Sequence, residues 1–449
     1  MKPARRQWRI GALLVLLALG LAGTAGAAPA EPGATPPPPS PLASLDARWG
    51  GHLKLRGALS DVEERSLYGL VDAGTYADAA FEGRLTNQTF FSDALYGEVH
   101  YELLVSGGDT RKTQQELGRR FPLLLSGTSY LTSGIEDDRR FLDLTRTFRA
   151  RDRYRVTHRL DRLFLAWTPG RASIRVGRQA VTWGNGLLFN PMDLVNPFAP
   201  SDIEREYKVG DDMISVRAPF PGAGEAQVIY VPRRSPVDGE VAWDRSSLAA
   251  KVHLARGTLE IDVLGALHYG EEVIGLGATG YAGSAAWRLD ATWTSLEEAE
   301  GQDGFLSLAA NVDTSWTWWD RNVYGFLELY YSGIGESEPG AAFGNRGLVD
   351  RVARGEIFTL GRTYLAGHVR LEAHPLLNVL LTVIHRLNEP SGLIQPRAVW
   401  DATRNLQVTV GAGIPYGGNG TEFDGFPLPG TDLLTPAPER FFVWATYYF

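Results

Sequence analysis

The sequence predicts an all-β fold, namely a single transmembrane antiparallel β-barrel of about 18 strands. Polar and apolar residues alternate with a period of two from residue 48 to the C-terminus, as they do in strands whose two faces meet different surroundings. Short and long connections alternate between these segments, and many of the Trp, Tyr and Phe residues lie near segment ends. These three observations together favour a barrel with short periplasmic turns and long extracellular loops.

The N-terminus comes before this pattern and predicts export. A basic stretch without acids, residues 1–9, is followed by an apolar run from Ile10 to Leu21. The run is shorter than the roughly 20 residues of a spanning helix, which favours a signal peptide over a retained anchor. We therefore expect a signal peptide over residues 1–28 and a proline-rich periplasmic linker over residues 29–47, followed by a barrel over residues 48–449.

The strands themselves are predicted from the alternation. In the first of them, Leu53 and Leu55 alternate with Lys54, so that one face is apolar and the other charged. The segments with this pattern are 48–60, 81–91, 94–106, 156–168, 172–183, 212–219, 224–231, 246–256, 258–268, 271–279, 284–295, 304–315, 322–332, 356–372, 376–387, 392–402, 404–415 and 439–449. An even number places both ends in the periplasm, and a count of about 16 also fits.

The connections distinguish a barrel from a soluble sandwich. Residues 92–93 and 256–257 are tight turns, whereas residues 107–155 and 416–438 are long polar loops. A soluble sandwich also alternates, but its loops are short at both ends and its charged face is the outer one. Closure into a barrel leaves no strand edge unpaired in lipid.

Aromatic residues fit the same topology. Those near strand ends are typical of interfacial girdles, and they include Trp316, Trp318, Trp319, Tyr330, Tyr331, Trp444, Tyr447 and Tyr448. The last strand ends in Phe449, which resembles the C-terminal assembly signal of Gram-negative outer-membrane proteins. That resemblance implies a partner, the outer-membrane barrel-assembly machinery.

Residues 176–200, VGRQAVTWGNGLLFNPMDLVNPFAP, form the most distinctive segment, because two Asn-Pro pairs end the strand that begins it. It resembles porin-like outer-membrane barrels related to alginate-export channels, in which GRQ precedes a Trp-Gly pair and a loop with Asn-Pro. The matching positions are Gly177, Arg178, Gln179, Trp183, Gly184, Asn190, Pro191, Asn196 and Pro197. The resemblance implies a barrel and no substrate site. The loop either folds inward and narrows the lumen or forms a rigid extracellular cap.

Arginine is concentrated in one zone. Residues 139–178 hold twelve arginines and three aspartates, although the whole chain has a formal net charge of -8. If this zone dips into the barrel, it forms a positive constriction that favours anions, with Arg146, Arg149, Arg151, Arg153 and Arg155 as the candidates. If it lies outside, its guanidinium groups suit the phosphates of lipopolysaccharide.

Charged residues on the polar faces predict a wet lumen or, alternatively, a plugged and purely structural interior. The candidates are Lys54, Arg56, Glu98, Glu102, Arg175, Arg217, Lys251, Glu260, Asp262, Arg288, Asp290, Glu328, Arg362 and Arg370. Acids and bases in opposed rows would produce a transverse field across such a lumen.

Signals for enzymes and cofactors are weak. The chain has no cysteine, which excludes disulfides, thiolate metal sites and cysteine nucleophiles. Gly275, Gly277 and Gly280 match GxGxxG, but they lie in an expected strand with no helix after it. We expect no cofactor, no metal site and no catalytic residue, and the acidic charge argues against nucleic-acid binding.

The sequence therefore predicts a porin-like channel in the outer membrane of a Gram-negative bacterium. Its cargo would be polar, with anionic solutes or an acidic polysaccharide favoured, and polysaccharide export would need periplasmic export components. Outer-membrane lipid and lipopolysaccharide are the other expected partners. The alternatives are a sealed barrel that binds surface polysaccharide or lipopolysaccharide, and an outer-membrane barrel enzyme.

Overall fold

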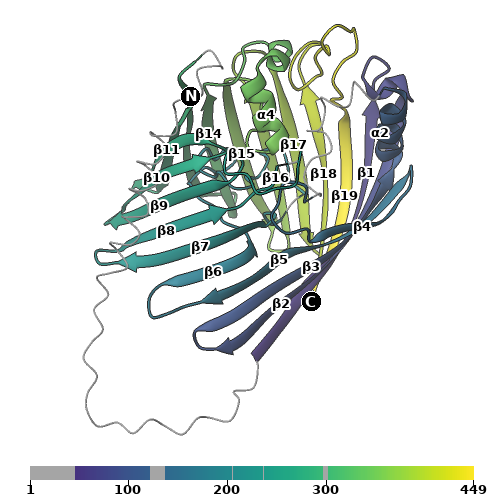
Figure 1. Ribbon diagram of the computed structural model, residues 1–449. Helices are drawn as coiled ribbons and strands as arrows, with labels where there is room; N and C mark the ends of the chain where they lie inside the picture. The colour runs from purple at the N-terminus through teal and green to yellow at the C-terminus, as the bar shows by residue number, and fades with distance from the viewer. Residues whose placement is uncertain (1–45, 122–136, 205, 236, 297–301) are drawn as a thin grey trace, which may run out of the picture.

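A computed structural model describes residues 46–121, 137–204, 206–235, 237–296 and 302–449. It shows the expected transmembrane β-barrel (Figure 1). The wall closes because β1 (Asp46–Val62) pairs with both β2 (Gly74–Ser92) and β19 (Glu439–Tyr448). All strand pairs are antiparallel, and closure removes the open sheet edge that lipid could not satisfy.

The sheet contains 19 strands, of which β4 (Thr145–Ala150) pairs only with β5, so that 18 form the closed wall. The other strands are β3 (Leu95–Gly108), β5 (Tyr154–Trp167), β6 (Ser173–Gln179), β7 (Asp211–Phe220), β8 (Gly224–Val231), β9 (Ser247–Arg256), β10 (Leu259–His268), β11 (Glu271–Ala282), β12 (Ala285–Ser295), β13 (Gly304–Trp318), β14 (Arg321–Ser332), β15 (Thr363–His374), β16 (Leu377–Arg386), β17 (Ser391–Asp401) and β18 (Leu406–Tyr416). The described helices are η1 (Tyr68–Leu70), α2 (Asp109–Arg120), η4 (Pro339–Gly344) and α4 (Arg346–Arg354).

The two faces of the wall differ as the alternation predicts. On β1, Leu55 is 61% exposed on the outside, whereas the neighbouring Lys54 is 2% exposed on the inside. Trp318 and Trp319 stack on each other at the periplasmic turn after β13 and are exposed to the surroundings. The barrel thus has an apolar outer surface, an aromatic edge and a polar interior.

Three strand boundaries differ from those expected by four residues or more. β2 begins at Gly74 instead of residue 81, and its added residues pair with β1 up to Val62. β6 ends at Gln179 instead of residue 183, because the chain leaves the wall there. β15 begins at Thr363 instead of residue 356, because the preceding segment packs with Leu348 of α4 in a small apolar core.

Long extracellular connections also carry elements that alternation could not reveal. Helix α2 and strand β4 lie at the same side of the barrel, at its extracellular rim (Figure 1). In the described part of the chain, no helix is long and apolar enough to cross a membrane. The expected signal peptide and most of the expected linker, residues 1–45, lie outside the described residues.

Candidate functional site

The connection between β6 and β7 passes through the interior of the barrel. We call residues 180–210 the inner loop, and the structure describes all of them except residue 205. The chain leaves the wall after Gln179 and rejoins it at Asp211, in adjacent strands that pair with each other. Between these points the loop contacts the inward-facing side chains of Lys54, Asp290 and Glu328. Of the two alternatives that the sequence left open, the structure therefore shows the inward fold.

One anchor of the inner loop is a carboxylate on β14. Glu328 accepts the backbone N–H groups of Leu187, Leu188 and Phe189 at 2.7, 3.0 and 2.7 Å. The side-chain amide of Asn311 donates to the same carboxylate at 3.0 Å. A buried carboxylate that accepts several N–H groups is well satisfied without a counter-ion, so this site fixes the loop by backbone contacts.

A second anchor lies on β12. Asp290 accepts the backbone N–H of Gly186 at 3.1 Å and the side-chain amide of Asn185 at 2.9 Å. Asp262 on β10 is a further acceptor for the same amide at 3.4 Å. The first part of the inner loop is therefore held by three acids of the wall.

The second part of the inner loop is held by another region of the wall. Lys54 on β1 donates to the carbonyl of Glu204 at 2.7 Å and to the carboxylate of Glu206 at 2.8 Å. Gln395 on β17 donates to the carbonyl of Ser201 at 2.9 Å. Bases and amides of the wall thus bind carbonyls and acids of the loop.

The inner loop also reaches β2. The hydroxyl of Tyr207 donates to Glu82, and the guanidinium of Arg84 lies 3.4 Å from the centre of the Tyr207 ring. In strand order around the wall, β2 stands second and β12 eleventh of 18, which places them on opposite sides. Because the loop binds both strands, it crosses the lumen.

Lys208 joins the end of the loop to its middle by a buried ion pair and to its beginning by a hydrogen bond. The ammonium of Lys208 lies 2.5 Å from the carboxylate of Asp193 and also donates to the carbonyl of Val181. Burial raises the pKa of Asp193 to about 6, against the opposing effect of Lys208. Removing one partner would leave the other charge buried without compensation.

The residues of the porin-like motif build this loop. Arg178 is buried and binds Asp137 at 3.0 Å and Asp212 at 2.9 Å. Gly184 has a φ of 85°, and a Cβ there would lie 2.1 Å from the side-chain oxygen of Asn190. Asn190 in turn donates to the carbonyl of Trp183 at 2.8 Å. The motif therefore specifies the exit from the wall and the turns of the inner loop.

The other motif positions have similar local roles. Gln179 donates to the carbonyl of Met213 at 3.1 Å, and Gly177 has a φ of 125°. Asn196 adopts a positive φ of 49° just before Pro197. Pro191 and Pro197 line a cavity on the extracellular side of the loop, described next.

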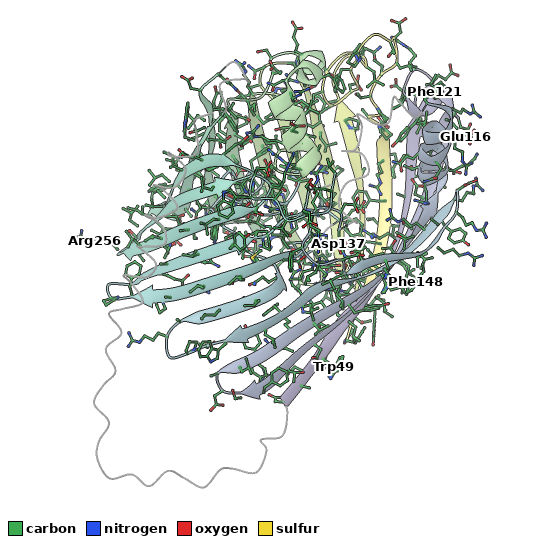
Figure 2. All side chains as sticks on the ribbon, viewed as in Figure 1. Trp49, Glu116, Phe121, Asp137, Phe148 and Arg256 are labelled. Carbon is green, nitrogen blue, oxygen red and sulfur yellow. The ribbon has the colours of Figure 1, made fainter. Side chains whose placement is uncertain are left out.

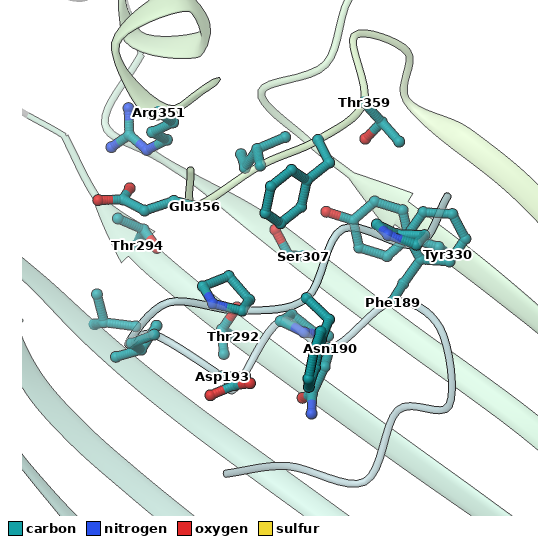
Figure 3. Close-up of a pocket in the computed structure, with 18 of the residues that line it drawn as sticks. Phe189, Asn190, Asp193, Thr292, Thr294, Ser307, Tyr330, Arg351, Glu356 and Thr359 are labelled. Carbon is teal, nitrogen blue, oxygen red and sulfur yellow. The ribbon is translucent and has the colours of Figure 1, made fainter. Parts of the chain in front are cut away.

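Two cavities border the inner loop. The vestibule, on the extracellular side, has a volume of about 80 Å³ and is bounded by Phe189, Asn190, Asp193, Tyr330 and Glu356 among others (Figure 3). The chamber has a volume of about 440 Å³ and lies between the loop and the wall formed by β1–β3, β5 and β17–β19.

The chamber has charged sides of opposite sign. The wall contributes four bases and one acid, and the described part of the loop contributes three acids: Lys54, Arg56, Arg159, Arg440 and Glu82 face Asp202, Glu204 and Glu206. Several of these groups pair across the boundary, for example Arg440 with Glu204 at 3.0 Å. A solute in the chamber would therefore meet a field directed from wall to loop.

The expected lumen-lining residues fall into three groups. Those that contact the inner loop are Lys54, Arg56, Asp262, Asp290 and Glu328. Those that bind other groups on the wall are Glu98, Glu102, Arg175, Arg217, Lys251, Arg288 and Arg370. Glu260 is exposed near the periplasmic end of β10, and Arg362 lies before β15 and binds the carbonyl of Gly335 at 2.7 Å.

The five candidate constriction arginines lie together on the hairpin of β4 and β5, at the extracellular rim. Arg146, Arg149, Arg151 and Arg153 are exposed, and Arg155 is half-buried against Thr residues of the same hairpin. The described residues that cross the lumen come from the inner loop instead. A contribution of these arginines to anion selectivity stays a prediction.

Sequence reasoning missed several residues that build the site. Lys208 and Asp193 could not be predicted to interact, because the residues of a loop follow no periodic pattern that indicates which of them are buried. Glu82 and Arg84 on β2, and Arg159 on β5, follow the same alternation as the predicted lumen residues and could have been found by extending that rule.

One cluster at the vestibule has the composition of a hydrolase triad. Ser247 lies 2.8 Å from Nδ1 of His268, whose Nε2 lies 3.2 Å from Glu356. Ser247 is only 1% exposed, and its hydroxyl also accepts a hydrogen bond from Arg233. A nucleophile must be reachable by substrate, so this trio fits a structural role. Among the described residues, no cluster of three or more acids or histidines is placed to hold a metal ion.

A closed wall of 18 strands with a loop inside it is the architecture of porin-type barrels in Gram-negative outer membranes. Solved structures that share this fold include OccAB1 and OccAB3 of Acinetobacter baumannii. OccAB1 is 8% identical, with 91% of this chain and 98% of that chain covered and a TM-score of 0.52. OccAB3 is 9% identical, with 89% and 99% covered and a TM-score of 0.51.

A BenF-like porin from Pseudomonas fluorescens is also similar, at 8% identity, with 90% of this chain and 98% of that chain covered and a TM-score of 0.49. At these identities the likeness is one of fold. The likeness does not support the expected relation with alginate-export channels. No protein-family model matches the chain, and no curated protein matches its sequence.

Proposed function

We propose that this protein is an outer-membrane channel through which small polar solutes pass beside the inner loop. The observation that carries the proposal is the chamber of about 440 Å³ between the loop and the wall, because it is lined by charged groups. Several of these groups pair with one another, as Lys54 does with Glu206 and Arg440 with Glu204, but they do not fill the space between the loop and the wall. A polar cavity of this size suits a small hydrated solute.

Small anions are the favoured cargo within this proposal. Four bases line the wall of the chamber, at Lys54, Arg56, Arg159 and Arg440, against one wall acid, Glu82. A carboxylate or phosphate would bind the wall side and avoid the acidic side of the loop. Export of an acidic polysaccharide is the weaker alternative, because a polymer would have to thread past a loop that is bound on both sides.

A sealed barrel is the second candidate, and a specific contact favours it. Lys54 and Glu206 form an ion pair between wall and loop at 2.8 Å, and such pairs narrow the passage that a solute would need. The barrel would then act at the surface, through its extracellular loops. The buried position of Ser247 argues against the third alternative, a barrel enzyme.

Single-channel recording distinguishes these functions. Refolded protein in a planar bilayer should give steady current steps, and a KCl gradient should give a reversal potential on the anion-selective side. The variant Lys54→Met tests the same passage, because it removes a base and opens the Lys54–Glu206 contact. It should lower anion preference. Silent but fully folded protein would overturn the channel proposal and support the sealed barrel.

A further inference from the structure

The hairpin of β4 and β5 carries a basic and aromatic surface on one face. Arg146 pairs with His158, and Arg149 pairs with Val156, so that these four side chains point to the same side. The ring of Phe148 stacks on His158, with 4.1 Å between centroids and 9° between planes. We call Arg146, Phe148, Arg149, Tyr154 and His158 the rim patch.

The rim patch faces away from the lumen. The ring of His158 also contacts Tyr101 of β3, an exposed residue, at a centroid distance of 5.7 Å. The opposite face of the hairpin carries Thr147 and Thr157, whose hydroxyls lie 3.1 Å apart, and Thr157 is buried. Phe148 is 65% exposed and lies on the outside of the barrel in Figure 2.

Position along β5 places the rim patch at the level of lipid head groups. Trp167 and Leu165, at the periplasmic end of the strand, are exposed and apolar. His158 and Tyr154 follow toward the extracellular end, and the arginines of β4 lie beside them. Apolar, aromatic and basic residues thus succeed one another in the order of hydrocarbon, interface and charged head groups.

Among the described residues, the arginines of the rim patch have no acidic partners. Other arginines near them are paired, as Arg153 is with Asp109 at 2.8 Å. Among the residues that the structure describes, no carboxylate forms an ion pair with Arg146 or Arg149. Exposed guanidinium groups without carboxylates are suited to bidentate binding of phosphate.

We infer that the rim patch binds the phosphate groups of lipopolysaccharide in the outer leaflet, with Arg146 and Arg149 on the phosphates and Phe148 in the interface beside the acyl chains. This assignment uses the membrane orientation of the barrel and holds whether or not the barrel conducts.

Binding of purified lipid A to the refolded protein in detergent micelles tests the inference. The variant Arg146→Gln/Arg149→Gln should weaken the Kd for bisphosphorylated lipid A by about tenfold or more, since each basic residue near an anionic surface contributes a severalfold effect. The matched control is Arg256→Gln/Arg321→Gln, which removes two exposed arginines from the periplasmic end (Figure 2 labels Arg256). The control should bind like the wild type.

Two further measurements test the chemistry. Lipid A without phosphates should bind the wild type and the double variant equally weakly. The inference is overturned if the double variant binds bisphosphorylated lipid A as tightly as the wild type, or if removal of the phosphates leaves wild-type binding unchanged. Displacement of lipid A by low-millimolar inorganic phosphate would also overturn it, in favour of a site for small anions.

Discussion

The carboxylate of Glu328 on β14 accepts the backbone N–H of Phe189 at 2.7 Å, across 139 residues of sequence. The same carboxylate accepts two neighbouring N–H groups, from Leu187 and Leu188. Consecutive N–H groups around one anion form a concave site of the kind that usually binds phosphate. Here the anion is a side chain of the wall, and the contact sets the path of the inner loop.

We expect Glu328→Gln to loosen the inner loop. Hydrogen bonds to a charged group each contribute about 1.5–3 kcal/mol, and the amide also turns an NH₂ group toward donors. Single-channel recordings in KCl should show higher mean conductance and more noise than the wild type. Glu260→Gln is the control, because Glu260 is exposed near the periplasmic end of β10. Identical recordings for Glu328→Gln and wild type would contradict the anchoring role.

The pair of Lys208 and Asp193 should be a strong local determinant of loop structure. Lys208→Met leaves Asp193 buried without a partner, which costs about 3–5 kcal/mol for a buried pair. Faster amide hydrogen exchange across residues 181–208 is the expected result. A second change, Asp193→Leu in the Lys208→Met background, should restore much of the protection. The ammonium of Lys112, exposed near Asp72, offers a control substitution with no effect on this segment.

Glu356 gives the stability of the vestibule a dependence on acid pH. Burial alone would raise its pKa, but the charges of His268, Arg354 and Arg351 outweigh that effect and lower the pKa to about 2. A carboxyl with a lowered pKa stabilises the folded state above its unfolded pKa of about 4.5, and the stabilisation is lost as pH falls from there toward 2. The difference in free energy of unfolding between wild type and Glu356→Gln should therefore shrink over this range. Urea unfolding in detergent at pH 7, 4 and 2.5 measures it, and a constant difference would refute the assignment.

The arginines of the hairpin provide a test of selectivity at the channel mouth. As exposed charges, Arg149, Arg151 and Arg153 should attract anions by a potential that salt screens within about 10 Å at 0.1 M. Their joint replacement by glutamine should lower anion preference in 0.1 M KCl and have little effect in 1 M KCl. An equal loss at both concentrations would instead place them at a constriction, and no loss at either would exclude them from selectivity.

The wall was predictable because its signal is local. The alternation of Leu53, Lys54 and Leu55 shows within three residues that β1 has an apolar and a polar face. The same pattern located the other strands of the wall. The predicted strand boundaries were wrong where the chain leaves the wall to form another structure. Residues after Gln179 continue to look like a strand, but they form the start of the inner loop.

The site was predictable only in part. Lumen acids such as Asp290 and Glu328 were predicted from their place on the polar face of a strand, because alternate side chains of a strand point to the same side of the sheet. Their role as anchors was not, because it depends on N–H groups of residues 185–189. Lys208 and Asp193 were not identified at all, since their interaction arises from the turns of the loop.

The sequence by itself determined the class of fold, the polar interior and the apolar exterior of this protein. These properties follow from period-two alternation, which acts between neighbouring residues and needs no distant partner. The tertiary structure alone decided that residues 180–210 cross the lumen and that the arginine-rich hairpin stands at the rim. The path of the loop depends on pairs such as Lys54 with Glu206 and Asn185 with Asp290, which are 152 and 105 residues apart. A hydrogen bond between such residues forms only after the wall has closed and brought them into contact.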